Sequence, residues 1–260
     1  MATGPDDVVV IPGGELAYWD TGGTGPVVVA LHPATGTAAT WAPQRAPLAD
    51  AGFRLVAYSR RGYLGSTPVD PGNPVSAAAD LAALVEALDL DRIHLVGAAM
   101  GGIYALDFAL TFPEVVHSLT AVGSMLGIVD ESWRTALARV GLPGSAQLPP
   151  EFRELGPSYR AENPDGVESW LRIARSAHPG GLHLQPTAGE ITWSTLRELR
   201  APTLLVGGGA DLLAPAPLLE QAAARLPQGR YAHVPDAGHA IAWERPDEFN
   251  RALLGFLRAG

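Results

Sequence analysis

The stretch that decides the fold is "IHLVGAAMGGIYALDFAL", from Ile93 to Leu110. It reads as a short apolar strand, a tight turn from Gly97 to Gly101, and a helix. This order matches G-x-S-x-G, the sharp strand-to-helix elbow that holds a serine nucleophile. Ala99 occupies the position of the serine, and a methyl group cannot attack a carbonyl carbon. The stretch therefore predicts the backbone of an elbow and leaves its chemistry open.

Apolar runs on both sides of this elbow predict the rest of a sheet. Each run is short, rich in β-branched residues and continuous rather than alternating, which indicates strands covered on both faces. The runs lie at residues 26–32, 53–59, 92–97, 118–124, 202–208 and 230–235. The opening segment instead reads as an antiparallel hairpin that turns at Pro12, Gly13 and Gly14. We therefore expect an open, twisted, mostly parallel α/β sheet with one antiparallel edge.

Helical patterns alternate with these runs. Residues 76–90 place apolar side chains three and four positions apart behind Ser76, a candidate N-cap. Residues 210–226 and 245–260 show the same spacing, the second with Pro246 near its start. Strands that alternate with helices are typical of α/β folds, in which helices flank the sheet.

The segment from about Met125 to Arg200 breaks this alternation, because it contains helical patterns but no strand-like run. We interpret it as a helical cap, residues 125–200, inserted into a core formed by residues 1–124 and 201–260. Long insertions in compact domains are usually functional, so we expect the cap to cover a pocket. Half of the six tryptophans fall in the segment, and we expect them to line a largely apolar binding site. They are Trp133, Trp170 and Trp193.

Composition narrows the classes of function. The 260-residue chain has a formal net charge of −9 and its 18 basic residues are all arginine, so a nucleic-acid partner is not expected. The lack of cysteine excludes disulfides, thiolate catalysis and cysteine-based metal sites. Neither metal-ligand spacing nor a phosphate-binding glycine loop is present, so we expect no metal and no cofactor. The acidic N-terminus is unlike a secretory signal and no apolar run reaches the ~18 residues of a membrane span, so we expect a cytoplasmic protein without a membrane partner.

Five stretches together carry a family resemblance. They are "LHPATG", "YSRRGYLGSTP", "LVGAAMGG", "LLVGGGAD" and "VPDAGHAIAWERPDEF", in that order. In sequence and context they resemble the α/β-hydrolase fold superfamily, and the likeness covers nearly the whole chain from about Glu15 onward. The resemblance implies the α/β-hydrolase fold with an inserted cap, and an enzyme that acts on a small molecule. It implies nothing about the oligomeric state.

Carried over position by position, the resemblance places Ala99 at the nucleophile, Asp211 at the acid and His239 at the base. In such a triad the carboxylate fixes the imidazole tautomer and stabilises the imidazolium that forms when the other ring nitrogen takes a proton. The resemblance also implies an oxyanion hole of backbone N–H groups. Its candidate donors are Ala34, Thr35 and Met100, and His32 is a candidate for shaping this loop and for contacting substrate.

Three interpretations of Ala99 stay open. In the first, a serine hydrolase has lost its hydroxyl by deliberate substitution and holds substrate without turnover. In the second, the alanine is native and His239 activates water or removes a substrate proton, which allows hydrolysis of an ester or lactone, or a lyase or isomerase reaction. In the third, the chain is a ligand-binding receptor without catalysis. In each case we expect the ligand to be a small, largely apolar carbonyl compound, because pockets are lined mainly by apolar and aromatic side chains.

Overall fold

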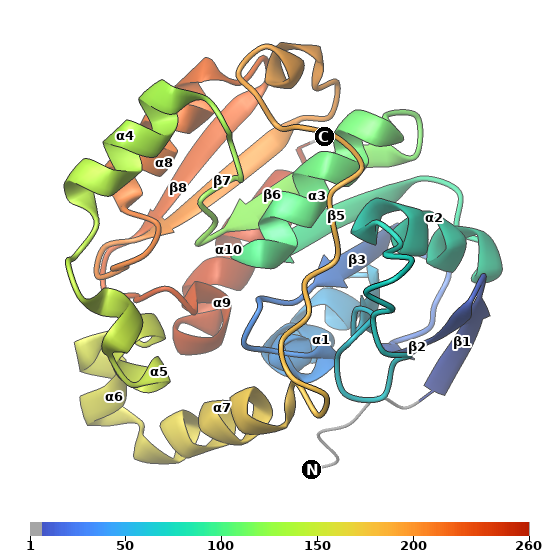
Figure 1. The fold of residues 1–260 in the computed structure, drawn as a ribbon, viewed down its shortest axis with the longest axis horizontal. Coiled ribbons are helices and arrows are strands. Elements are labelled where there is room, and N and C mark those ends of the chain that lie inside the picture. The colour runs from blue at the N-terminus through green and yellow to red at the C-terminus, as the bar shows by residue number, and fades with distance from the viewer. Residues whose placement is uncertain (1–6, 260) are drawn as a thin grey trace.

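An eight-stranded sheet forms the centre of the molecule (Figure 1). The computed structural model describes residues 7–259, and within them the strand order is β1-β2-β4-β3-β5-β6-β7-β8. Neighbouring strands from β4 to β8 pair in parallel, while β2 pairs antiparallel with both β1 and β4. The strands are β1 (Asp7–Ile11), β2 (Gly14–Asp20), β3 (Val27–Leu31), β4 (Arg54–Tyr58), β5 (Ile93–Ala98), β6 (Val116–Val122), β7 (Thr203–Gly208) and β8 (Gly229–Val234). The predicted parallel sheet with one antiparallel edge is confirmed.

The hairpin at the sheet edge turns where the sequence predicts. Ile11 pairs with Gly14, so only Pro12 and Gly13 form the turn, and Gly13 adopts a positive φ of 74° that a side chain would disfavour. Residues 1–6 lie outside the described residues. They include part of the acidic N-terminus that the sequence analysis found unlike a secretory signal.

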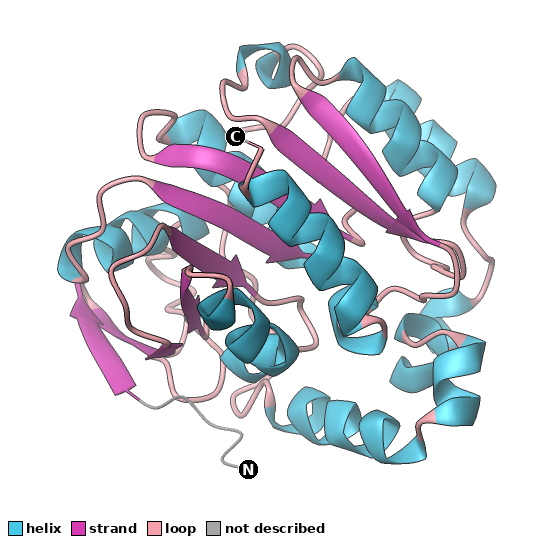
Figure 2. Cartoon of the chain, turned by 180° about the vertical axis from the view of Figure 1, so that it is seen from behind, coloured by secondary structure: helices cyan, strands magenta, loops and turns pink. Residues whose placement is uncertain are grey.

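Helices cover both faces of the sheet. Successive strand residues point to opposite faces, so Val28 and Ala30 pack on one side of β3, and Val29 and Leu31 on the other. The first face is covered by α1 (Ala42–Asp50), α9 (Ile241–Glu244) and α10 (Pro246–Leu257), and the second by α2 (Ala77–Ala87), α3 (Met100–Thr111) and α8 (Ala216–Arg225). Seen from behind, the C-terminal helix α10 crosses the sheet in Figure 2. A short 3-10 helix, η1 (Ala38–Trp41), precedes α1.

Two helix starts differ in how closely they follow the sequence pattern. The hydroxyl of Ser76 accepts the N–H of Ala79, so the predicted N-cap of α2 is confirmed. The helix predicted over residues 210–226 is shorter, because α8 begins only at Ala216. The preceding residues form a turn, in which the Asp211 carboxylate accepts two backbone N–H groups.

The segment between β6 and β7 consists of helices and loops, and its described residues contain no strand. It holds α4 (Glu131–Val140), η2 (Ser145–Gln147), α5 (Pro150–Glu154), α6 (Pro157–Glu162), α7 (Pro164–Ser176) and η3 (Thr195–Glu198). In Figure 1, α5, α6 and α7 lie together beyond the carboxyl ends of β6, β7 and β8. These three helices contribute a small apolar cluster around Tyr159 and Trp170, against which Ala240 and Trp243 of the core pack, whereas Trp133 and Trp193 belong to the main core.

In residues 7–259, no helix combines the length and the apolar character that crossing a membrane requires.

Candidate active site

Ala99 stands at a strained elbow between β5 and α3. Its φ of 50° and ψ of −113° lie in a sparsely populated region, which costs on the order of 1–3 kcal/mol for a residue with a Cβ. Close packing requires the flanking glycines: a Cβ on Gly97 would lie 2.3 Å from the carbonyl oxygen of Gly101, and one on Gly101 would lie 2.2 Å from that of Leu31. The backbone therefore presents residue 99 as an elbow presents a nucleophile, although the side chain is a methyl group.

Asp211 and His239 come together from the ends of neighbouring strands. Asp211 follows β7 and His239 follows β8, and the His239 Nδ1 lies 2.9 Å from Oδ2 and 3.0 Å from Oδ1 of Asp211. Asp211 Oδ1 also accepts the N–H groups of Leu213 and Ala214, at 2.8 and 2.9 Å. Both side chains are buried. The carboxylate is thus held in place and assigns the Nδ1 proton, which leaves Nε2 as an acceptor.

The surroundings of His239 favour its protonated form. Burial by itself would lower the pKa of His239, but the charge and hydrogen bond of Asp211, followed by the charges of Glu154 and Glu244, raise this pKa above its ordinary value. A proton taken up by the ring is therefore stabilised, as the base of a hydrolytic reaction requires.

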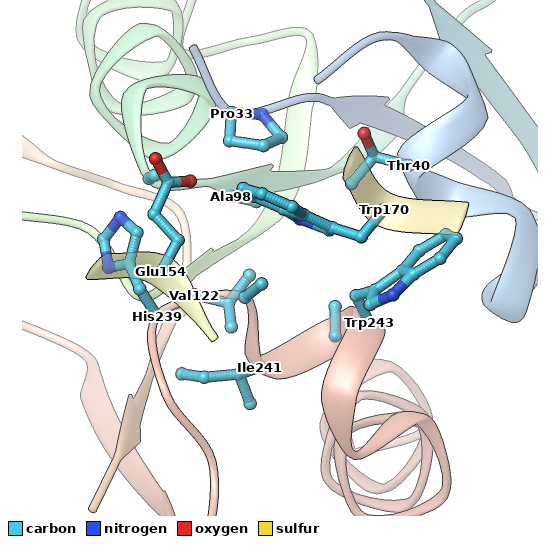
Figure 3. Close-up of a pocket in the computed structure, with 12 residues that line it drawn as sticks. Pro33, Thr40, Ala98, Val122, Glu154, Trp170, His239, Ile241 and Trp243 are labelled. Carbon is cyan, nitrogen blue, oxygen red and sulfur yellow. The ribbon is translucent and has the colours of Figure 1, made fainter. Parts of the chain in front are cut away.

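A small cavity lies against Ala99 and His239. Its volume is about 20 Å³, which is room for a single water molecule. Figure 3 draws Glu154 and His239 on one side of the cavity and Trp243 on the other. The lining is largely apolar and consists of Pro33, Thr40, Ala98, Ala99, Val122, Glu154, Trp170, His239, Ala240, Ile241, Ala242 and Trp243. The elbow and the imidazole therefore share one space, as expected from the sequence.

The loop of the predicted oxyanion donors runs beside this cavity and is held by its carbonyl groups. Pro33 O lies 2.7 Å from His32 Nδ1 and accepts from Arg60 Nη2 at 3.4 Å, and Ala34 O lies 2.6 Å from His178 Nε2. The described residues offer no acceptor to the N–H groups of Ala34, Thr35 or Met100. These N–H groups are consequently available as donors, and that of Met100 lies at the N-terminus of α3.

The position of His32 corrects the expectation that it contacts substrate, because the structure does not place it against the cavity. It is fully buried, its Nδ1 engages Pro33 O, and its Nε2 accepts the N–H of Arg60 at 2.9 Å. The ring of Tyr63 packs edge-on against it, with centroids 4.3 Å apart. Both ring nitrogens are used within the protein, so His32 shapes the oxyanion loop and leaves nothing to offer a substrate.

The tryptophans of the insertion separate into two groups. Trp170 lines the cavity, as expected. Trp133 and Trp193 do not, because they pack edge-to-face against each other with centroids 5.4 Å apart, inside the main core. Trp243 lines the cavity and was missed, although it follows His239 by four residues within the stretch "DAGHAIAW".

Glu154 is the functional candidate that sequence reasoning did not find. Its buried carboxylate lines the cavity, and no local motif surrounds it in the sequence. Only the docking of α5 against the loops of the core brings it beside His239.

Comparison with known proteins identifies the family. A family model described as "Alpha/beta hydrolase family" matches residues 28–252, and the chain belongs to that family. The chain is 32% identical over 259 residues to a Mycobacterium tuberculosis protein named "Putative non-heme bromoperoxidase BpoC", covering 94% of this chain and 97% of that one. A Pantoea ananatis protein named "Putative carbamate hydrolase RutD" is 32% identical over 241 residues, covering 86% and 85%. The malate-bound structure of a thermophilic esterase from Thermogutta terrifontis aligns with a TM-score of 0.78 at 26% identity, covering 97% of this chain and 98% of that one.

Proposed function

We propose that this protein hydrolyses a small, neutral and largely apolar ester or lactone without forming an acyl-enzyme. His239 is the general base, Asp211 orients it, and the N–H groups of Met100 and of Ala34 or Thr35 receive the oxyanion. The observation that carries the proposal is the His239–Asp211 pair, joined at 2.9 Å, with its imidazole opening on the cavity against Ala99.

The chemistry works without a serine hydroxyl. Sites of this kind that lack a triad member retain roughly 10³- to 10⁴-fold acceleration over water from the oxyanion hole and binding. General-base action adds typically about 10² to 10⁴. Ala99 supports this route by its small size, because a methyl group leaves room for water where a larger side chain would fill the cavity.

The cavity and the relatives support the substrate class. Trp170, Trp243 and Val122 offer apolar surface, and pockets for small apolar ligands are lined in this way. The similar proteins include one named an esterase and one named a putative carbamate hydrolase, and esters and carbamates both contain a carbonyl carbon bonded to a heteroatom. A cavity of about 20 Å³ is smaller than any ester, so binding requires the side chains that line it to move apart.

The elbow supports a second candidate, a serine hydrolase whose hydroxyl was removed. An alanine gains nothing from the strained φ of 50°, whereas a serine at this position would be presented for attack. On this route the Ala99→Ser variant would react through an acyl-enzyme. The codon at position 99 of the natural gene decides whether the alanine is native.

Two substitutions test both routes on p-nitrophenyl acetate and butyrate. On the first route, the protein as it stands hydrolyses ester, and His239→Ala lowers kcat/KM by about 10²- to 10⁴-fold. On the second, Ala99→Ser produces a burst of p-nitrophenol and raises turnover by several orders of magnitude. Binding of an ester or lactone by a protein that is inert with either residue at position 99 would support a receptor instead. Inertness of both forms on esters and lactones, with no effect of His239→Ala, refutes the hydrolase proposal.

A further inference from the structure

Glu154 connects three parts of the candidate site. Its Oε2 accepts the hydroxyl of Thr35 at 2.6 Å, and its Oε1 accepts Arg153 Nη2 at 2.8 Å. Its main-chain carbonyl accepts the N–H groups of His239 and Ala240, at 2.9 and 3.0 Å. The carboxylate is therefore fixed between the oxyanion loop and the histidine loop, with only 4% of the residue exposed.

The fixed carboxylate keeps acceptor capacity for the cavity. An ionised carboxylate has about four lone-pair sites, and the contacts to Thr35 and Arg153 use one on each oxygen. A buried water needs about two to four polar partners and the volume of about one probe sphere. The cavity of about 20 Å³ meets the volume requirement, and Glu154 and His239 both line it beside Ala99. Figure 3 shows their side chains next to each other at the same end of the cavity.

We infer that Glu154 is a catalytic residue that, together with His239, holds the attacking water above Ala99. The inference deepens the hydrolytic function proposed above and rests on it. One O–H of the water donates to the Glu154 carboxylate, and the other donates to the His239 Nε2. This arrangement aims an oxygen lone pair at the carbonyl carbon of a substrate whose oxygen lies at the oxyanion loop.

Attack of this water hydrolyses the substrate in two steps. The water oxygen forms a bond to the carbonyl carbon while His239 Nε2 takes one proton, and the carbonyl π pair moves to the oxygen as the oxyanion. When the oxyanion collapses, the bond from carbon to the leaving oxygen breaks and His239 returns its proton to the leaving alkoxide. The products are an acid and an alcohol, or a hydroxy acid from a lactone, and Glu154 keeps its charge throughout.

The charges around His239 make the inference measurable. The acidic groups that act on the imidazole are Asp211 from the β7 loop, Glu154 from α5 and Glu244 from α9, while Arg153 pairs with the outer oxygen of Glu154. Each of the three carboxylates raises the pKa of His239. Removal of the Glu154 charge therefore lowers that pKa, and the fall in kcat beside it reports on the attacking water.

The test compares Glu154→Gln with Glu151→Gln, a matched change on the same helix outside the cavity lining. On p-nitrophenyl butyrate, Glu154→Gln lowers kcat by about 10²-fold or more, leaves KM within about threefold, and moves the midpoint of the pH profile to lower pH. Glu151→Gln changes none of these. NMR titration of the His239 ring gives a readout independent of turnover, and thermal unfolding checks that both variants fold. Glu154→Asp restores part of the lost kcat.

The outcomes distinguish a failure of the role of Glu154 from a failure of the proposed hydrolase function. If the parent protein hydrolyses ester and requires His239, but Glu154→Gln keeps kcat and the pH midpoint, the role of Glu154 is overturned and the hydrolase proposal stands. The role of Glu154 is also overturned if the ring of His239 titrates identically in both proteins. If the parent protein does not turn over any ester or lactone and His239→Ala changes nothing, both fall together.

Discussion

The two loops beside the cavity, the histidine loop and the oxyanion loop, contact groups of different charge. On the side of the histidine loop, His239 is surrounded by carboxylates, which are Asp211, Glu154 and Glu244. On the side of the oxyanion loop, the loop carbonyls contact the buried Arg60 and His32 and the half-buried His178, while the Glu154 carboxylate reaches this loop only through the hydroxyl of Thr35. In the proposed reaction, a general base attacks an ester through water, which creates a positive imidazolium and a negative oxyanion at the same moment. The carboxylates around His239 would stabilise the first charge, and the donors of the oxyanion loop would stabilise the second.

Two buried histidines show the effect of these charges. Burial, followed by the charge of Arg60, lowers the pKa of His32 well below its ordinary value, whereas the carboxylates raise that of His239 despite its burial. Both rings are buried, so burial alone does not decide the charge of a histidine. The carboxylates beside His239 outweigh its burial, whereas Arg60 adds to the effect of burial on His32.

Arg60 places a cation against the oxyanion loop. Its guanidinium donates to the carbonyl oxygens of His32 and Pro33 and, at 3.1 Å, to the hydroxyl of Tyr63. The rings of Tyr63 and Tyr104 lie 4.8 and 5.1 Å from its carbon Cζ. Pro33 C=O and Ala34 N–H belong to one peptide unit, so a cation on the carbonyl polarises the N–H that is proposed as an oxyanion donor.

The largest loss of activity is expected when the charge of Asp211 is removed from the carboxylates around His239. Asp211→Asn keeps an oxygen for the N–H groups of Leu213 and Ala214 but removes the charge that fixes the tautomer of His239. We expect kcat for ester hydrolysis to fall by about 10³- to 10⁴-fold. Asp236→Asn, an exposed change in the histidine loop, is the control and should leave kcat within about twofold. A loss below about tenfold in Asp211→Asn would remove the orienting role of Asp211.

A smaller loss is expected when the charge of Arg60 is removed. Arg60→Met withdraws the donors from His32 O and Pro33 O, and we expect kcat to fall by about 10- to 100-fold with KM nearly unchanged, less than the loss of a direct oxyanion donor. Arg54→Met, which breaks a partly exposed ion pair with Asp20, is the control. Steady-state kinetics beside thermal unfolding separates the effect on catalysis from one on stability, and Arg60→Lys serves if the methionine variant does not fold. Equal losses in Arg60→Met and Arg54→Met would contradict the assignment.

The pH dependence sharpens the comparison between the histidines. His239 acts as a base only when neutral, so activity is absent at acid pH and rises through a midpoint above the ordinary value of about 6.5. The free energy of unfolding depends on pH in the opposite direction to activity. Protonated His239 stabilises the folded protein fully below about pH 6.5, and this stabilisation is lost as pH rises through the pKa of His239 in the folded state. His32 acts in the opposite sense, since only the unfolded chain protonates it below about pH 6.5, and stability falls as pH falls.

Rate profiles and urea unfolding between about pH 5 and 9 check both statements. His239→Gln should lose more stability at pH 6 than at pH 9 relative to the parent protein. A variant difference that grows with pH, or an activity midpoint below about 6.5, would contradict the raised pKa.

The smallest effect is expected at the elbow. Ala99→Gly relieves the positive φ and should stabilise the protein by about 1 kcal/mol, with the larger entropy of the unfolded glycine offsetting part of the gain. Ala105→Gly in the middle of α3 is the matched control and should destabilise it by about 1 kcal/mol or more. Urea unfolding measures both, and destabilisation by Ala99→Gly would show that the elbow is not strained.

Local sequence signals predicted the frame of the site. The glycines around Ala99, the hairpin turn at Pro12 and the N-cap at Ser76 each depend on neighbours in the chain, so short motifs suffice. The pairing of Asp211 with His239 was predicted from motif order within the family resemblance. Their contact in the structure agrees with that prediction, while their catalytic roles remain to be tested by the variants above.

Longer-range contacts were beyond such signals. Glu154 meets Thr35 across 119 positions of the chain, and no local pattern reports how α5 docks. Trp133 and Trp170 sit in similar helical patterns, yet only Trp170 faces the cavity, because residue type does not reveal which face of a helix meets the core. His32 was misassigned for a related reason, since the backbone of Arg60 that occupies its Nε2 comes from another loop.

The main-chain contact between Glu154 and the histidine loop has a consequence for recombining this protein with its relatives. His239 and Ala240 donate to the carbonyl of residue 154, and Glu244 accepts the N–H groups of Gly156 and Gly238 at 2.8 and 3.0 Å. A chimera that exchanges residues 125–200 as a block keeps these contacts only if its new main chain places a carbonyl and an N–H where residues 154 and 156 have them. The insertion therefore cannot be exchanged independently of the histidine loop. A chimera designed to change substrate specificity should keep residues 154–156 from the same protein as the core.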